Sequence, residues 1–313
     1  MNKEGLILID KPVALTSHDV VLQIREILHF RKVGHFGTLD PLATGLLLIA
    51  VGRATRFFPF YSKMDKSYRG TIKLGWATST YDTEGEPITE PVSSWPPREE
   101  IEDIFQSFLG RVRQLPPLFS AKKFKGKPLY YLARQQKEVK RQPIEIEIYR
   151  FQLINYQPPL IEFELDCSSG TYVRTLAHDL GEKLGCGAHL YQLTRTKIGH
   201  LDLKLSFTLE KIAELAAKQE YEKFIIPLEK LLPFFPKLIL DERGSFLISQ
   251  GNSVSERRII QRLPAEEDFS FHRSQPPEEM AFIFRAFNLQ GQLLGLAKYQ
   301  SEKRSFQPFL VIS

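Results

Sequence analysis

The chain has 313 residues, with 42 basic and 37 acidic side chains and two cysteines. Hydrophobic residues make up 42% and charged residues 25%, which argues against a largely disordered chain. Cys167 and Cys186 lack the C-x-x-C spacing, which argues against a disulfide framework or a thiolate metal site. The longest apolar run, Leu46 to Val51, is far shorter than the ~20 residues of a membrane span, so we expect a soluble, cytoplasmic protein.

The N-terminal part predicts a strand followed by a helix. Residues 5–10, GLILID, form a short apolar run that is typical of a buried strand. Apolar residues from Val20 to Leu28 recur at helical spacing, and Thr16 with Asp19 can form a capping box in front of them.

A glycine-rich segment comes next. Residues 34–45, GHFGTLDPLATG, contain three glycines and a proline, so we expect a loop rather than a regular element. The loop leads into a core strand over residues 46–51. Residues 67–75 alternate as a strand does, with Tyr68 on the apolar face.

The central part mixes helices and strands. A helix is predicted over residues 98–109, paired strands over 144–154 and 160–166, and a helix over 172–184 that ends at a glycine. Because the order has no regular βαβ period, an α+β fold is favoured over a doubly wound sheet.

The C-terminal part predicts a second, smaller domain. Three prolines in residues 227–238 indicate a linker, and short apolar runs separated by turns follow it. We therefore expect a domain at residues 1–237 and a β-rich domain at residues 238–313.

Positive charge is concentrated in one stretch. Residues 111–141 hold ten basic side chains and one acid with interleaved aromatics, whereas residues 238–313 hold nine of each charge. A basic stretch with aromatic side chains suits a nucleic acid, since the cations meet phosphates and the rings stack on bases. A solvated, lysine-rich loop would have the same composition.

Three residues are candidates for chemistry. Asp40 lies in the glycine-rich loop, where it could meet a ligand or cap its own turn. Arg174 lies in the first turn of its helix and opposes the helix dipole. That unfavourable position makes a carboxylate or phosphate partner more expected than for an ordinary arginine, and a plain surface arginine is the equal alternative. Tyr68 by itself reads most simply as a core tyrosine.

Metal and nucleotide chemistry find little support in the sequence. The pairs His18-Asp19 and His178-Asp179 resemble those of metal-dependent phosphohydrolases, but adjacent residues on a helix point about 100° apart and converge poorly. No Gly-rich phosphate-binding motif is present, so we expect neither a metal nor a nucleotide cofactor.

Several longer motifs carry a resemblance to a known family. They are DKPVALTSHDVV (10–21), KVGHFGTLDPLATGLLLIAVGRATR (32–56), DKSYRGTIKLG (65–75), LPPLFSAKKFKGKPLYYLAR (115–134), SSGTYVRTLAHDLGEKLGCGAHL (168–190) and a C-terminal segment at about 238–313. With these motifs the chain resembles the TruB family, the bacterial tRNA pseudouridine-55 synthases, over nearly its full length, and the C-terminal segment is PUA-like.

The resemblance implies a fold and a partner. It implies a pseudouridine synthase domain at residues 1–237, with a mixed, mostly antiparallel sheet, and a small β-barrel-like PUA domain at 238–313. The partner would be the T-arm of tRNA, bound by a monomer, with a basic insertion at 111–141 closing over the RNA. The side chains expected to bind RNA there are Lys122, Lys123, Lys125, Lys127 and Arg134.

The resemblance also implies residue roles. Asp40 matches the catalytic aspartate, Arg174 the arginine paired with it, and Tyr68 the tyrosine that stacks on the target uracil. His35 matches the histidine that fills the space left in the T-loop. The other residues expected to bind or support the substrate are Leu193, Tyr172 and Lys11.

Three positions depart from the family pattern. Phe36 stands where a small polar residue is typical, Ala14 where glycine is typical, and Ser79 where aspartate is typical. Asp40, Tyr68 and Arg174 are not affected, although Phe36 bears on the direction of His35.

The implied reaction converts uridine to pseudouridine. The C1′–N1 bond breaks and C1′ joins C5 without gain of electrons or water, so the reaction needs no cofactor. An ionised Asp40 could attack C1′, attack C6 or remove a proton. Two alternatives remain: an RNA-binding or RNA-folding protein on the same scaffold without catalysis, and a metal phosphohydrolase built on the His-Asp pairs.

Overall fold

The computed structural model describes residues 3–118, 123–124, 127–128, 141–266, 280 and 282–312. Lys122, Lys125 and Arg134, three of the expected RNA-binding residues, lie outside this part of the chain. Lys123 and Lys127 are described only as members of the short paired strands β6 (Lys123–Phe124) and β7 (Lys127–Pro128).

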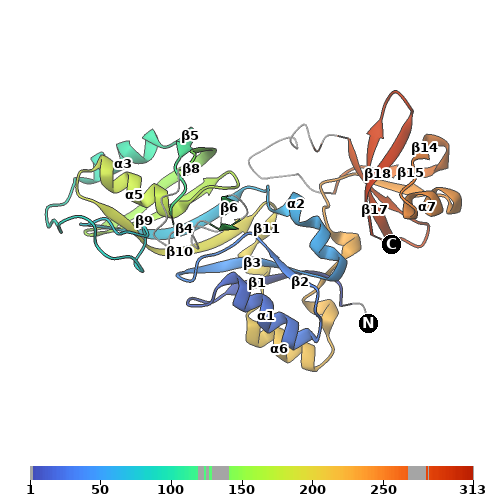
Figure 1. The fold of residues 1–313 in the computed structure, drawn as a ribbon, viewed down its shortest axis with the longest axis horizontal. Helices are drawn as coiled ribbons and strands as arrows, with labels where there is room; N and C mark the ends of the chain where they lie inside the picture. The colour runs from blue at the N-terminus through green and yellow to red at the C-terminus, as the bar shows by residue number, and fades with distance from the viewer. Residues whose placement is uncertain are drawn as a thin grey trace.

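A large sheet forms the main body of the molecule (Figure 1). Its strands run in the order β12-β1-β3-β10-β4-β9-β8-β5, with β2 against β3 and β11 against β10. The strands are β1 (Gly5–Lys11), β2 (Val33–Phe36), β3 (Ala43–Val51), β4 (Lys66–Leu74), β5 (Gly110–Gln114), β8 (Ile144–Gln157), β9 (Leu160–Cys167), β10 (Ala188–Ile198), β11 (Leu201–Asp202) and β12 (Ile226–Pro227). Among these described strands only β3 and β10 pair in parallel, which confirms a mixed, mostly antiparallel sheet.

Strands β1 and β3 are apolar along most of their length because both of their faces are buried. Ile7 and Ile49 belong to one apolar cluster, whereas their neighbours Leu6 and Leu48 belong to another on the opposite face. The first cluster also contains side chains of the helices α1 (Ser17–Leu28), α3 (Arg98–Ser107), α5 (Val173–Lys183) and α6 (Leu209–Ala217).

The predicted start of α1 is confirmed. The Thr16 hydroxyl accepts a hydrogen bond from the Asp19 backbone N–H, and the Asp19 carboxylate accepts one from the Thr16 backbone N–H. This reciprocal capping begins the helix at Ser17. The short helices that follow in the chain are η1 (Gly52–Phe57), α2 (Phe58–Tyr61), η2 (Leu203–Leu205), η3 (Tyr221–Lys223) and η4 (Leu228–Lys230).

The C-terminal part forms a second sheet at one end of the molecule (Figure 1). Its order is β14-β18-β17-β16-β13-β15, and α7 (Glu242–Ser249) packs against it. The strands are β13 (Lys237–Leu240), β14 (Val254–Ser255), β15 (Ile259–Leu263), β16 (Ile283–Phe287), β17 (Leu293–Gln300) and β18 (Ser305–Val311), with η5 (Glu256–Arg258) before β15. The β-rich character is confirmed, whereas the PUA-like assignment stays a prediction.

The two sheets share an apolar cluster. Phe60 of α2 contacts Phe235 and Phe309, and the Arg53 guanidinium donates a hydrogen bond of 2.9 Å to the Ile312 carbonyl. Residues 227–238 connect the two sheets, as the prolines predicted, and this connection is not an exposed segment. Five of their apolar side chains are buried in the shared cluster: Leu228, Leu231, Leu232, Phe234 and Phe235.

The prediction of a loop over residues 34–45 was wrong at both ends. β2 extends to Phe36 and β3 begins at Ala43, so the irregular part covers only residues 37–42. The glycines of this segment do not prevent strand pairing, since Gly34 and Gly45 both take part in the ladders of β3. No helix in the described part of the chain is long and apolar enough to cross a membrane.

Candidate active site

A concave pocket of about 260 Å³ lies where the 37–42 loop meets β4, β10 and the beginning of α5. Four of the residues expected from the sequence line it together with Asp40, and these are Tyr68, Tyr172, Arg174 and Leu193. The remaining lining residues are Gly37, Thr38, Leu39, Ala43, Ser62, Lys66, Gly170, Thr171, Val173 and Arg195. The fold therefore brings residues that are more than 150 positions apart in the chain to one cavity.

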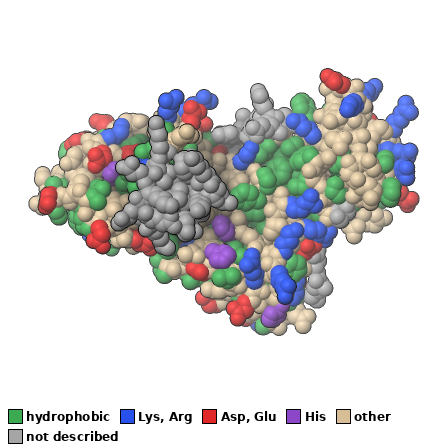
Figure 2. Space-filling model, in the orientation of Figure 1, with side chains coloured by type: hydrophobic (Ala, Val, Ile, Leu, Met, Phe, Trp, Pro, Cys, Tyr) green, Lys and Arg blue, Asp and Glu red, His purple; other side chains and the backbone are tan. Residues whose placement is uncertain are grey.

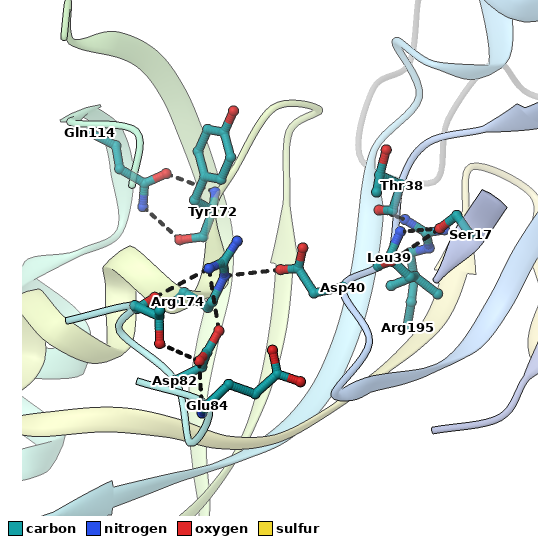
Figure 3. Close-up of polar contacts among 11 residues, drawn as sticks. Ser17, Thr38, Leu39, Asp40, Asp82, Glu84, Gln114, Tyr172, Arg174 and Arg195 are labelled. Carbon is teal, nitrogen blue, oxygen red and sulfur yellow. Dashed lines mark hydrogen bonds and ion pairs between the residues drawn. The ribbon is translucent and has the colours of Figure 1, made fainter. Parts of the chain in front are cut away.

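Asp40 and Arg174 form an ion pair in this pocket (Figure 3). Arg174 Nε lies 2.9 Å from Asp40 Oδ2, and the Arg174 side chain is 7% exposed while the Asp40 side chain is 41% exposed. On its other side, Arg174 Nη1 lies 3.3 Å from Asp82 Oδ2 and donates to the Thr80 carbonyl at 3.2 Å. The arginine is thus held by buried groups and presents one edge to the open carboxylate.

The position of Arg174 explains its need for two anions. It is the second residue of α5, where the positive end of the helix dipole disfavours a cation. Asp40 and Asp82 supply the opposite charge that compensates both the dipole and the burial of the guanidinium.

The surroundings of Asp40 change its acidity. Partial enclosure by the pocket walls raises the pKa of the Asp40 carboxyl above its ordinary value, and the charge of Asp82 raises it further. The adjacent Arg174 guanidinium opposes this rise but does not cancel it. Asp40 therefore takes up a proton at higher pH than an exposed aspartate does.

Asp82 is itself fixed by the turn in which it lies. Its Oδ1 atom accepts hydrogen bonds from the Thr80 hydroxyl at 2.5 Å and from the Glu84 backbone N–H at 3.0 Å. With Oδ1 occupied in this way, Oδ2 is left to face Arg174. No role for Asp82 was predicted from the sequence.

The loop that carries Asp40 is tied to the segments on either side. The Ser17 hydroxyl donates to the Leu39 carbonyl at 3.0 Å and accepts from the Leu39 N–H at 2.8 Å. The Ala14 N–H donates to the Pro41 carbonyl at 2.9 Å. Ala14 makes this contact at a φ of +71°, a left-handed conformation that glycine adopts more easily, which accounts for the glycine typical of this position in the family.

Tyr68 lies at the apolar edge of the pocket and is 9% exposed. Burial raises the pKa of the Tyr68 hydroxyl to about 12, so the phenol is protonated at neutral pH. Lys66, two residues earlier on β4, donates to the Ser62 carbonyl at 2.8 Å, and burial lowers the pKa of its ammonium group to about 7.

Tyr172 is held at the pocket by its backbone. The amide of Gln114 on β5 donates to the Tyr172 carbonyl at 3.0 Å and accepts from the Tyr172 N–H at 2.7 Å (Figure 3). The buried Gln114 thereby fixes the residue that precedes α5, and with it the start of the helix that carries Arg174.

Two of the expected residues do not line the pocket. Lys11 is fully buried and donates to the carbonyls of Pro12 at 2.8 Å and Leu15 at 2.7 Å, so it supports the loop beside the site. Burial lowers the pKa of Lys11 to about 8. His35 lies on β2 opposite Ile49, ahead of the Asp40 loop, and burial lowers the pKa of its ring.

The structure accounts for one further departure from the family pattern. Phe36 is buried, stacks on Tyr61 with ring centroids 5.5 Å apart and meets Phe58 edge-on. It therefore anchors the end of β2, next to His35, in the apolar cluster shared by the two sheets. Nothing in the structure explains why Ser79 replaces an aspartate.

Four residues that line or support the pocket were not predicted from the sequence: Arg195, Lys66, Gln114 and Ser17. Buried and more exposed side chains alternate along this part of β10, and Arg195 lies two positions after the buried Leu193. An arginine on the buried face of a strand could therefore have been recognised from the sequence as a candidate functional residue. The interactions of Gln114 and Ser17 connect residues 58 and 22 positions apart, and no local pattern reports such contacts.

The two His-Asp pairs do not form a common site. Asp19 is engaged in the capping box of α1, and His178 stacks on Tyr81 with ring centroids 3.9 Å apart. Among the described residues, no group of three or more His, Cys, Asp or Glu side chains could hold a metal ion.

Comparison with known proteins identifies the family. The sequence profile described as "TruB family pseudouridylate synthase (N terminal domain)" matches residues 25–173. A protein named tRNA pseudouridine synthase B from Solibacter usitatus is 44% identical over 79% of this chain and 85% of its own length. The chain belongs to the TruB family.

Other TruB-family matches cover almost the entire chain. The profile "tRNA pseudouridylate synthase B C-terminal domain" matches residues 174–233. The protein named tRNA pseudouridine synthase B from Clostridium acetobutylicum is 37% identical over 96% of both chains. The family profiles thus end before the second sheet, whereas the similarity to this relative includes most of it.

Solved structures share the fold at low sequence identity. One is titled as an H/ACA RNP bound to a substrate RNA containing 2′-deoxyuridine, with a TM-score of 0.72, 22% identity and coverage of 99% of this chain and 86% of that one. Another, titled as a Cbf5-Nop10-Gar1 complex, has a TM-score of 0.72 and 23% identity, with coverage of 99% and 85%. These likenesses support the pseudouridine synthase fold for the large sheet.

Proposed function

We propose that this TruB-family enzyme isomerises uridine to pseudouridine at position 55, in the T-loop of tRNA, with Asp40 as the catalytic residue. The observation that carries the proposal is the Asp40–Arg174 ion pair, which lies in a concave pocket beside Tyr68 and Leu193. The names of the relatives, tRNA pseudouridine synthase B, support tRNA as the substrate.

The chemistry fits a site built from one carboxylate and its partners. The reaction breaks the C1′–N1 bond, forms a C1′–C5 bond and moves the C5 proton, with no net gain or loss of atoms. Asp40 in its ionised form assists the glycosidic cleavage. Arg174 keeps this carboxylate oriented, since a guanidinium binds a carboxylate with fixed geometry and stays charged when buried.

Tyr68 and Leu193 would receive the uracil. The ring of Tyr68 offers a flat face for stacking, and its protonated hydroxyl serves as a hydrogen-bond donor or acceptor rather than as a base in the free enzyme. Leu193 contributes an apolar wall from β10. A uridine inside a folded loop must leave its stack to reach this pocket, which costs a few kcal/mol.

Basic side chains would supply the affinity for RNA. Lys and Arg side chains gather over and beside α2 on the face shown in Figure 2, and Arg56 and Lys63, which flank that helix, are exposed. Further RNA contacts would come from the basic insertion at 111–141, from His35 and from the C-terminal domain at 238–313. The protein would act as a monomer. Phosphate contacts of this kind position an RNA without reading its sequence.

The test uses purified protein and an unmodified tRNA transcript, without added metal or nucleotide. We expect pseudouridine at position 55 only, and none when that uridine is replaced by cytidine. Asp40→Asn should abolish turnover while tRNA affinity stays within about tenfold, because phosphate contacts elsewhere dominate binding. Modification at another position would refute the site assignment, and an active Asp40→Asn enzyme would refute the role of Asp40.

A further inference from the structure

Arg195 is one of the largest fully buried side chains in the described part of the chain, and it lines the active-site pocket. Each nitrogen of its guanidinium donates to a backbone carbonyl. Nε donates to Leu46 at 2.8 Å, Nη1 to Thr38 at 3.3 Å and Nη2 to Gly37 at 3.2 Å. No carboxylate among the described residues lies within ion-pair distance of it.

The three carbonyls lie on either side of Asp40 in the chain. Gly37 and Thr38 precede Asp40, and Leu46 follows it inside β3. Arg195 itself is fixed in the middle of the sheet, where its backbone pairs with Gly45 on β3 and Tyr68 on β4. A single side chain thus ties the residues just before Asp40 and the strand that follows it to β10. Figure 3 shows the contact with Thr38.

Burial of a guanidinium without an acidic partner is costly, which calls for an explanation. Arg285, the other arginine of comparable burial, has an acidic partner, as buried arginines usually do. It donates to the carbonyls of Phe235 and Leu231 and pairs with Glu266 at 2.7 Å. Arg195 instead leaves its charge near Asp40 and the Tyr68 hydroxyl, where it acts on the groups that face the substrate.

We propose that Arg195 is a positioning residue for the isomerisation, holding the 37–42 loop so that the Asp40 carboxylate meets both Arg174 and the uridine. The inference rests on the proposed function. Arg195 acts through the loop and through its charge, and it needs no contact with the reacting atoms. Displacement of a catalytic group by about 1 Å can cost about 100-fold in rate, so a loosened loop has a large kinetic effect.

The experiment compares Arg195→Lys and Arg195→Met with Arg285→Lys as the matched control. Arg285 also spans backbone carbonyls, but it is fully buried in the C-terminal part and cannot touch RNA. The single-turnover rate at saturating tRNA, the tRNA dissociation constant and the melting temperature are measured for each, with rates taken well below melting. If Arg195→Lys does not fold, Arg195→Gln, whose amide still donates a hydrogen bond, replaces it.

We expect Arg195→Lys to lower the single-turnover rate by about 30-fold or more while tRNA affinity stays within about threefold. Arg285→Lys should lower the melting temperature with little change in that rate. Arg195→Met, which also removes a positive charge near Asp40, should in addition move the acid limb of the rate profile to higher pH.

The outcomes separate this inference from the proposed function. A wild-type protein that forms no pseudouridine would refute the proposed function and the inference with it. An active wild type together with a full rate in Arg195→Lys would overturn the inference alone. Equal rate losses in Arg195→Lys and Arg285→Lys, with an unshifted pH profile in Arg195→Met, would also overturn it, since they would reveal a general effect of stability.

Discussion

Arg174 makes two different contacts with one guanidinium, and a lysine could not reproduce them. Nε faces Asp40 while Nη1 faces Asp82 and the Thr80 carbonyl, so the planar fork determines the direction of each hydrogen bond. We expect Arg174→Lys to lower the single-turnover rate by about 100-fold while tRNA binding changes little. A rate within about twofold of wild type would show that the geometry of the pair is unimportant.

The acid limb of the pH profile should report on Asp40. Its pKa is raised, so the ionised form and the rate are complete above that pKa and fall as the pH drops through it. The negative charge of Asp82 contributes to the rise. Asp82→Asn should therefore move the midpoint of the pH profile of log kcat/KM to lower pH.

The control for this shift is Asp103→Asn, which removes an exposed carboxylate on α3. Its midpoint should equal that of the wild type. A midpoint that moves upward in Asp82→Asn would contradict the assignment of the limb to Asp40, because loss of a neighbouring anion can only ease ionisation.

At the scale of elements, the segment between β1 and α1 carries a strained residue. Ala14 has a φ of +71°, and its N–H donates to the Pro41 carbonyl in the loop that carries Asp40. Ala14→Gly should raise the free energy of unfolding by about 0.5–1 kcal/mol, since glycine adopts this conformation without steric cost. Chemical denaturation measures the change. Ala177→Gly, inside α5, should destabilise by about 1 kcal/mol instead, and a loss in both variants would argue against strain at Ala14.

The sequence predicted helices and strands well where contacts between residues close in sequence determine the structure. The Thr16–Asp19 capping box, the alternation around Tyr68 and the helix that carries Arg174 were all found from neighbours in sequence. The predicted loop over 34–45 was too long, because the pairing of β2 with β3 outweighs the preference of glycine for turns. For the same reason, contacts made across the sheet by Arg195 and Gln114 were missed, since no local signal encodes their partners.

At the scale of the whole molecule, the two sheets depend on each other. Leu231, Phe235 and Phe60 lie in one apolar cluster with Leu293 and Leu310 of the second sheet. Deleting residues 238–313 should therefore lower the melting temperature as well as weaken tRNA binding, because it exposes apolar surface that the full chain buries. Thermal melts and tRNA titrations measure the two effects. An unchanged melting temperature would indicate that the second sheet is an independent appendage.

Positive charge is concentrated in residues 111–141. Residues 111–141 have a net charge of +9, while the entire chain has +5, so this insertion should dominate the electrostatic attraction of RNA. Replacing Lys122, Lys123, Lys125 and Lys127 by glutamine should weaken tRNA binding and flatten its salt dependence. Each lost phosphate contact removes about 0.7–0.9 from the magnitude of the log–log slope, so the loss of four contacts should reduce it by up to about 3.6.

The matched control removes the same number of charges from another surface. Lys204, Lys211, Lys218 and Lys223 are exposed around α6, and their replacement by glutamine lowers the net charge equally. If attraction depended only on net charge, both fourfold variants would shift the dissociation constant to the same extent. If the insertion contacts phosphates, only the first variant loses slope across a salt series, because counterions are released solely where lysine and phosphate meet. Retention of both affinity and slope in the first variant would mean that these lysines only solvate the insertion.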